Sequence, residues 1–180
     1  MKKYNTIFLD RDGTINPDPG YISSLEQFKF YDFTFDALIS LAKNKNRFCI
    51  ITNQSGVSRG LINPEDLNNI HNYIKNKFME NSVPLLGVYF CIDHPDNSTP
   101  RRKPGSGMFL EASKDHKIEL KNSVMIGDSK DDIQVGKDLG MDTILVLTGR
   151  GEKTITDNPD INPTIIVDNL KKAADWILNE

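Results

Sequence analysis

Two carboxylates with one residue between them, Asp10 and Asp12, directly follow a short apolar run near the start of the chain. A third acid, Asp128, follows another such run. Carboxylates that crowd together at buried strand ends cannot all stay ionised without a cation. A hard divalent ion such as Mg²⁺ accepts carboxylate and water oxygens in octahedral geometry. The three acids therefore predict a Mg²⁺ site.

Groups that bind anions accompany these acids. Lys103 offers a positive charge, and the segment 52–56 (Thr-Asn-Gln-Ser-Gly) can offer backbone N–H groups after a third apolar run. Carboxylates, a metal ion, a lysine and backbone donors around one point make a phosphoryl-transfer site. There, one aspartate can attack phosphorus, while a second protonates the leaving alcohol and then activates water. Asp10 and Asp12 point to the same side of an extended strand, so both can reach one substrate.

Apolar runs alternate with helical patterns along the chain, and these elements must position the candidate residues. Consecutive apolar residues predict six strands, at 6–9, 48–51, 85–91, 124–126, 143–147 and 165–167. Helices are predicted over 35–42, 64–80, 106–116 and 130–139 and from about Leu170, with a surface loop at 156–163. Strands without polar alternation are covered on both faces, which predicts a doubly wound, mostly parallel α/β sandwich of three layers. Ligands of such sheets bind beyond the carboxyl ends of the strands, where the candidate residues converge.

The composition excludes several classes of protein. The chain has 180 residues, 22 Lys and Arg against 25 Asp and Glu, and a net charge of −3. We therefore expect one domain over 1–180 and no surface for nucleic acid. The apolar runs are far shorter than the roughly 18 residues of a membrane helix, and the chain start shows no secretory signal. We expect a cytoplasmic, monomeric protein that does not bind membranes, in which Cys49 and Cys91 form no disulfide.

Four segments in this order resemble the four motifs of the haloacid dehalogenase superfamily of phosphatases. They are DRDGT at 10–14, the Thr of TNQSG at 52–56, the Lys of RRKPGSGM at 101–108, and GDSKDDI at 127–133. The resemblance implies a Rossmann-like fold with strand order 5-4-1-2-3 and the sixth strand at an edge. It also implies Asp10 as nucleophile and Asp12 as general acid and base, with Thr52 and Lys103 on the phosphoryl group. Mg²⁺ would then bind Asp10, the backbone carbonyl of Asp12, and Asp128.

Within that superfamily, the residues around the motifs resemble the D-glycero-D-manno-heptose 1,7-bisphosphate 7-phosphatases. The similar segments are DRDGTINPDPGYI at 10–22, TNQSGVSRG at 52–60 and RKPGSGM at 102–108. The resemblance implies removal of the 7-phosphate of that sugar bisphosphate in the biosynthesis of lipopolysaccharide or capsule heptose. The chain has little room for a large cap domain, so loops would shape the substrate pocket. The predicted substrate contacts are Asp18, Gly20, Tyr21, Asn53, Gln54, Ser55, Arg59 and Arg102; the two arginines suit a second phosphate.

The chain departs from this family at one loop. The family usually carries a structural zinc site, written Cys-x-His and then Cys-x-Cys directly before Arg-Lys-Pro. Here the two parts read Cys91-Ile92-Asp93-His94 and Thr99-Pro100-Arg101, so only Cys91 stands in register. A structural zinc site needs four nitrogen or sulfur ligands. We therefore predict no zinc.

Other functions remain open at this point. A histidinol-phosphate phosphatase would carry the same four motifs, whereas a polynucleotide 3′-phosphatase would need a basic stripe. A phospho-acceptor receiver domain is the non-enzyme alternative, although it would hold its phosphate rather than hydrolyse it. Asp131 and Asp132 are interpreted as acids that favour a helix N-terminus, with Asp132 also a candidate to hold a metal-bound water. His71, His94 and His116 are assigned no catalytic role.

Overall fold

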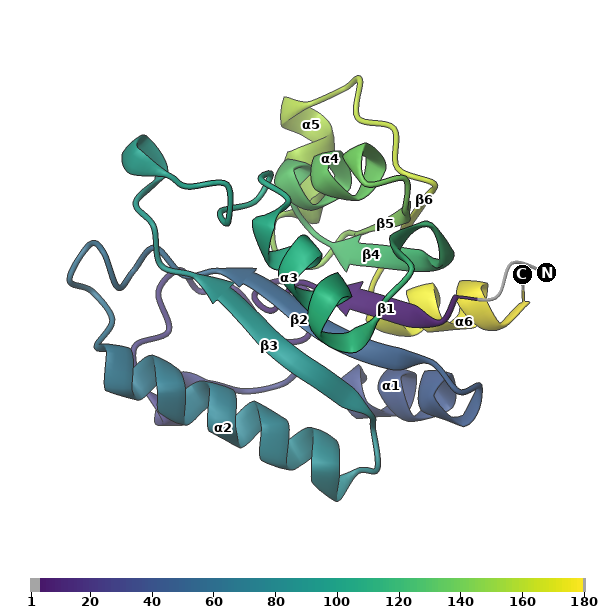
Figure 1. The fold of residues 1–180 in the computed structure, drawn as a ribbon, viewed down its shortest axis with the longest axis horizontal. Helices are drawn as coiled ribbons and strands as arrows, with labels where there is room; N and C mark the ends of the chain where they lie inside the picture. The colour runs from purple at the N-terminus through teal and green to yellow at the C-terminus, as the bar shows by residue number, and fades with distance from the viewer. Residues whose placement is uncertain (1–3, 180) are drawn as a thin grey trace.

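The computed structural model describes residues 4–179, in which six parallel strands form one sheet (Figure 1). The strands are β1 (Thr6–Leu9), β2 (Arg47–Asn53), β3 (Leu85–Cys91), β4 (Ser123–Gly127), β5 (Asp142–Val146) and β6 (Ile165–Val167). Their order is β3-β2-β1-β4-β5-β6, and each neighbouring pair is parallel. The doubly wound α/β prediction and the implied strand order are confirmed. Residues 1–3, part of the start for which no secretory signal is expected, and residue 180 lie outside the described residues.

Helices cover both faces of this sheet. Residues of α1 (Thr34–Lys43), α2 (Pro64–Glu80) and α6 (Leu170–Asn179) join one hydrophobic cluster. Residues of α3 (Gly107–His116) and α4 (Lys130–Asp138) join a second cluster. In β1, Ile7 and Leu9 point into the first cluster and Phe8 into the second. The strand is buried on both faces, which accounts for its unbroken apolar sequence. Within the described chain no separate cap domain is present.

Local sequence sets the start of two helices. At α2, the Asn63 side chain accepts the N–H of Glu65, and Pro64 occupies the first turn. At α4, Ser129 and Asp132 form a capping box, in which each side chain accepts the backbone N–H of the other residue. Because only two residues separate the end of β4 from the start of α4, this capping box lies at the carboxyl edge of the sheet, beside the predicted site.

The main difference from the predicted elements follows β5. A short helix, α5 (Gly151–Asp157), occupies the first two residues of the stretch 156–163 that was predicted to be a loop. Its start gave no sequence signal, because the N-cap residue Arg150 makes no side-chain cap and a glycine opens the first turn. Single 3₁₀ turns lie at Leu25–Gln27, Pro95–Asn97 and Leu120–Asn122.

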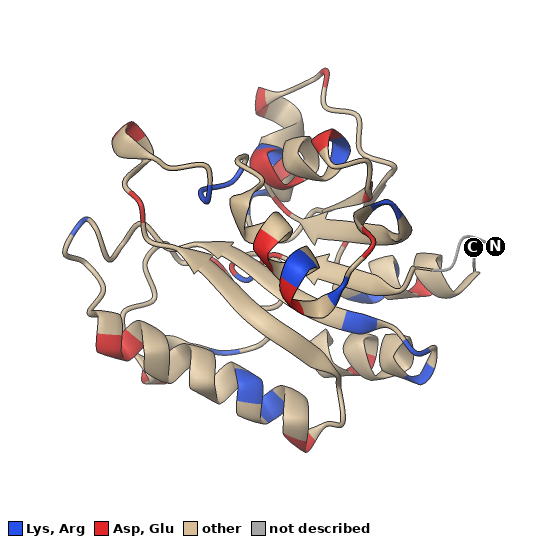
Figure 2. Cartoon of the chain, viewed as in Figure 1, with Lys and Arg blue, Asp and Glu red and all other residues tan. Residues whose placement is uncertain are grey.

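Charged residues of both signs are mixed over the helices and loops seen in Figure 2, with no band of one sign along the sheet. Among residues 4–179, no helix combines the length and apolar character needed to cross a bilayer.

Candidate active site

A cavity of about 330 Å³ opens at the carboxyl edge of the sheet, where the ends of β1, β2 and β4 meet. Every residue that the sequence analysis placed in the site lines this cavity. These residues are Asp10, Asp12, Asp18, Gly20, Tyr21, Thr52, Asn53, Gln54, Ser55, Arg59, Arg102, Lys103 and Asp128. Convergence of the four motifs is therefore a property of the fold, whereas the role of each residue stays a prediction.

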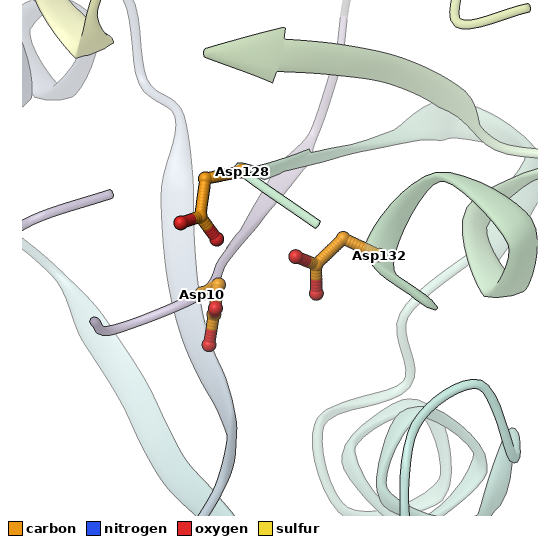
Figure 3. Close-up of side chains that lie close together, drawn as sticks. All are labelled: Asp10, Asp128 and Asp132. Carbon is orange, nitrogen blue, oxygen red and sulfur yellow. The ribbon is translucent and has the colours of Figure 1, made fainter. Parts of the chain in front are cut away.

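Three carboxylates face one another at this edge: Asp10 after β1, Asp128 after β4 and Asp132 in the first turn of α4 (Figure 3). One oxygen of each lies within 4.8 Å of the others. Asp10 and Asp128 belong to the predicted ligand set, and Asp132 joins them here, while the side chain of Asp12 lies outside the group of three. Oxygen donors grouped in this way suit a hard divalent cation, and the Asp12 backbone carbonyl remains a predicted ligand.

Lys103 supplies the cation that the structure itself places among these acids. Its Nζ lies 2.9 Å from Asp10 Oδ1 and 2.6 Å from Asp132 Oδ1, and it donates a hydrogen bond of 2.8 Å to the carbonyl of Ile51. The side chain is only 3% exposed. Burial disfavours the charge, but Asp10 and Asp132 outweigh that effect and raise the pKa of Lys103, so the lysine is positively charged at neutral pH.

One lysine does not balance three buried carboxylates. Burial raises the pKa of Asp10 to about 7; the charge of Lys103 opposes this shift and the charge of Asp132 adds to it. Burial and the neighbouring charges of Asp10 and Asp132 raise the pKa of Asp128 to about 8. Both acids thus bind protons more tightly than usual, first because they are buried and second because neighbouring carboxylates add negative charge. A divalent cation would remove that excess, so the donor set fits the Mg²⁺ that the sequence predicts.

Two glycines allow the backbone to close around Asp128. Gly13 has φ of +84°, and a Cβ there would lie 2.1 Å from Asp128 Oδ2; a Cβ on Gly149 would lie 2.2 Å from the same atom. Any side chain at either position would therefore displace the carboxylate. The backbone N–H of Arg150 donates to Asp128 Oδ2 at 2.7 Å. The turn between β5 and α5 thereby fixes this acid, a contribution that the sequence analysis did not predict.

The Asp12 carboxylate turns toward a buried cation instead of the acidic group. Arg11 Nε donates to Asp12 Oδ1 at 3.0 Å, and Arg11 Nη2 donates to Asp12 Oδ2 at 2.8 Å. Asn16 Nδ2 also donates to Oδ1, and Gln54 Nε2 to Oδ2, at 2.9 and 2.8 Å. Arg11 is fully buried and also contacts His71 of α2. Asp12 and Gln54 are among the residues predicted for the site, whereas Arg11 and His71 are not.

Some of the predicted substrate contacts are held by hydrogen bonds or an ion pair within the protein, whereas Tyr21 is exposed. Asn53 bridges two loops, because its amide donates to the carbonyl of Lys103 and accepts the Lys103 N–H, both at 3.0 Å. Asp18 accepts the N–H of Gly20 at 3.1 Å and pairs with Arg150 Nε at 3.0 Å. Tyr21 is 47% exposed at the rim.

The loop at the position of the family's zinc site is held by hydrogen bonds. Asp93 Oδ2 accepts both the backbone N–H and the hydroxyl of Thr99, at 2.7 and 2.6 Å. Arg102 Nη1 donates to the Asp93 carbonyl at 3.2 Å, which ties the loop to the cavity wall. His94 accepts the N–H of Asp96. Within residues 4–179, the acidic group of Figure 3 is the one cluster of three or more potential metal ligands, and Cys91 and His94 are not part of it.

Comparison with known proteins decides the family. A family model described as HAD-hydrolase-like matches residues 100–173. The D-glycero-beta-D-manno-heptose-1,7-bisphosphate 7-phosphatase of Vibrio cholerae is 33% identical over 96% of this chain and 95% of its own length. The beta-form 7-phosphatase of Helicobacter pylori is 36% identical over 95% of both chains, and the alpha-form enzyme of Burkholderia mallei is 38% identical over 82% of both.

The chain belongs to the heptose-1,7-bisphosphate 7-phosphatase family. The fold of this phosphatase agrees: the crystal structure of D,D-heptose 1,7-bisphosphate phosphatase from B. bronchiseptica, complexed with magnesium and phosphate, superimposes with a TM-score of 0.89. It is 28% identical to this phosphatase and covers 97% of this chain and 98% of its own. The resemblance read from the four motifs is thus confirmed at the level of family and fold.

Proposed function

We propose that this protein is a Mg²⁺-dependent phosphatase that removes the 7-phosphate of D-glycero-D-manno-heptose 1,7-bisphosphate. The observation that carries the proposal is that Asp10, Asp12, Thr52, Lys103 and Asp128 all line one cavity. These are the residue types that phosphoryl transfer through an aspartyl phosphate requires. The relatives are named for this substrate. The reaction would serve the biosynthesis of lipopolysaccharide or capsule heptose.

In this proposal the phosphoryl group moves in two steps. A carboxylate oxygen of Asp10 attacks phosphorus, the bond to the sugar oxygen breaks, and that oxygen takes a proton from Asp12. A water molecule then gives a proton to Asp12 and attacks phosphorus, which breaks the bond to Asp10 and releases phosphate. Thr52 and Lys103 hold the phosphoryl oxygens during both steps. Mg²⁺, when bound by Asp10, Asp128 and the Asp12 carbonyl with support from Asp132, would offset negative charge on phosphate and carboxylates.

The second phosphate of the substrate would be bound at the rim of the cavity. Arg59, Arg102 and Arg150 line it, and they are cations outside the acidic group. A guanidinium suits a phosphate because its planar N–H groups match two oxygens at once. Asp18 and Gly20, in the loop after β1, would orient the sugar between the two phosphates, with Tyr21, Ser55 and the backbone of 53–54 completing the contacts.

The protein would work without zinc, because the Asp93–Thr99 hydrogen bonds and the Arg102 contact already hold the loop where relatives carry zinc ligands. It would be a monomeric cytoplasmic enzyme formed by one domain over 1–180, with a small sugar bisphosphate as its ligand and neither nucleic acid nor membrane as a partner.

Phosphate release from a panel of substrates tests this function. The panel holds heptose 1,7-bisphosphate, sugar monophosphates, histidinol phosphate and an aryl phosphate, each measured with Mg²⁺ and with EDTA. We expect the highest kcat/KM for heptose 1,7-bisphosphate, dependence on Mg²⁺, and loss of turnover in Asp10→Asn. Preference for histidinol phosphate would keep the mechanism and reject the substrate. A stable phosphoprotein without turnover would favour a receiver-like role and reject both.

A further inference from the structure

Arg11 is a charged side chain with no exposure to solvent, packed between β1 and α2. A guanidinium carries five N–H donors and no acceptor. Nε and Nη2 donate to Asp12, and Nη2 also contacts the Gln54 side-chain oxygen at 3.1 Å. Nη1 lies 3.4 Å from His71 Nε2. The arginine is therefore fixed from two sides, by the loop that carries Asp12 and by a helix distant in sequence.

The Asp12 carboxylate has no freedom to turn in this arrangement. Each of its oxygens accepts two N–H groups, from Arg11 and Asn16 at Oδ1 and from Arg11 and Gln54 at Oδ2. A carboxylate has about four acceptor positions, and these donors use them, so the bond from Asn16 or Gln54 must open when Asp12 carries a proton, while the two bonds from Arg11 keep its orientation. Two of the four donors belong to Arg11, and the bidentate geometry sets the plane of the carboxylate. The orientation of Asp12 thus follows the orientation of Arg11.

His71 can act only as an acceptor toward Arg11. Because the arginine has no acceptor atom, the Nε2 that faces it must be unprotonated. Burial, followed by the charge of Arg11, lowers the pKa of His71 to about 3, so the ring is neutral in the physiological range. The ring also packs against Phe90 of β3, with 4.9 Å between centroids. The imidazole is therefore held in place by α2 and β3.

We propose that His71 is a positioning residue for the acid–base step, acting through Arg11 on the orientation of the Asp12 carboxylate. The proposal rests on the proposed function only in requiring that Asp12 transfers the proton. His71 is not among the residues that line the cavity. Its loss should therefore slow the proton-transfer steps and leave substrate binding unchanged.

Two amide variants make a matched test. In His71→Gln the amide oxygen reaches the position of Nε2 and can accept from Arg11, whereas in His71→Asn the shorter side chain cannot. We expect kcat for the sugar phosphate to fall about tenfold in His71→Asn, with KM unchanged within about twofold. In His71→Gln, kcat should return to within about threefold of wild type. His116→Asn, a substitution on α3 away from the cavity, should match wild type.

An aryl phosphate separates the two chemical steps. Its phenolate leaves without a proton, so Asp10 should be phosphorylated at nearly the wild-type rate in His71→Asn, while hydrolysis of the phosphoenzyme slows. We therefore expect a burst of about one phenolate per active site in stopped flow, absent for wild type. Thermal melts establish that each variant is folded, and His71→Leu replaces His71→Asn if the latter is not.

Three results would overturn the proposal. They are equal kcat losses in the Gln and Asn variants, a loss confined to KM, or a reduced active fraction without a burst. The substrate panel on wild type decides the proposed function separately. If wild type prefers another phosphate ester, the same variants are compared on that ester, and the ratio between Gln and Asn still decides the role of His71.

Discussion

The two halves of the site solve the problem of buried charge in opposite ways. The acidic half has three carboxylates and one lysine: Asp10, Asp128, Asp132 and Lys103. The arginine half has one carboxylate and one arginine, enclosed by two neutral side chains: Asp12, Arg11, Gln54 and His71. In the first half negative charge is in excess, and burial raises two pKa values. In the second half the charges are balanced and hydrogen bonds use every acceptor position of Asp12.

This difference indicates what each half is built to do. A group of unbalanced buried charges costs stability until a ligand of opposite sign binds. A balanced and hydrogen-bonded pair contributes a fixed geometry without any ligand. The acidic half is therefore suited to bind Mg²⁺, and the arginine half to hold Asp12, the residue predicted to transfer the proton, in one orientation. Substitutions in the two halves should affect activity and stability in different combinations.

Asp128→Asn should give the largest loss of activity among these tests. The amide keeps an oxygen for the Arg150 N–H but loses the charge that the metal needs, so kcat/KM should fall by about 10³. At pH 9, where Asp128 is ionised, the same change removes one of the repelling charges, so the Mg²⁺-free variant should melt at a higher temperature than wild type. Mg²⁺-dependent assays and thermal melts in EDTA measure the two effects. A variant that loses activity and melts lower would show that Asp128 has a structural role instead.

Arg11→Met should lower the stability of the protein, in contrast to Asp128→Asn. Removing one partner of a buried ion pair leaves the Asp12 charge uncompensated, which costs about 3 kcal/mol of unfolding free energy. Denaturant unfolding with and without Mg²⁺ measures this cost. Addition of Mg²⁺ should not restore the loss, since Asp12 keeps its side chain outside the acidic group. Recovery by Mg²⁺ would mean that the two halves are not independent.

The two halves differ in how far the sequence alone could predict them. Asp10, Thr52, Lys103 and Asp128 were predictable because motif residues that follow parallel strands meet at one edge of the sheet. His71 was not predictable, since its contact with Arg11 spans 60 positions and its only local signal is a helix face. A residue whose contact joins two distant elements can therefore be identified only once the tertiary structure is known.

For Asp132, the sequence predicts one of its contacts but not the other. Its place three residues after Ser129 indicates a helix start, and the capping box confirms that interpretation. The same carboxylate has a second oxygen, which pairs with Lys103. A local pattern can predict one contact of a carboxylate, but the use of its other oxygen depends on which element packs against it. Arg150 is similar, because only the turn after β5 brings its N–H to Asp128.

The affinity for Mg²⁺ should depend on pH in a direction set by the acidic half. The pKa values of Asp10 and Asp128 are raised to about 7 and about 8, so protons compete with the metal below those values. Without metal, the stability that these raised pKa values provide is fully present below the ordinary carboxyl pKa of 3.8 and is lost progressively as pH rises to the folded values of about 7 and about 8. The increase in melting temperature caused by Mg²⁺ should therefore grow from pH 6 to pH 9. In Asp128→Asn this growth should be smaller, and a pH-independent increase would contradict the excess-charge interpretation.

Arg150→Met should have a smaller effect, confined to binding. The guanidinium is exposed and pairs with Asp18, so solvent screens its charge, while its backbone N–H still holds Asp128. We expect KM for the bisphosphate to rise about threefold, with kcat unchanged and with a weaker effect at high salt. A sugar monophosphate that lacks the second phosphate serves as the control and should show no change. A fall in kcat would instead show that the Arg150 side chain contributes to the chemical step.

Treatment with a zinc chelator should have no effect on stability or activity. The loop between β3 and α3 is ordered by the Asp93–Thr99 hydrogen bonds and the Arg102 contact, and Cys91 and His94 lie apart from the metal-ligand cluster. Dialysis against a zinc-selective chelator should therefore change neither the melting temperature nor kcat/KM once Mg²⁺ is restored. Asp93→Ala is the informative partner, because it breaks the hydrogen bonds that replace the metal and should raise KM through Arg102. If the chelator and the substitution had equal effects, a metal would have to hold this loop. If only the substitution has an effect, side-chain hydrogen bonds alone order this loop.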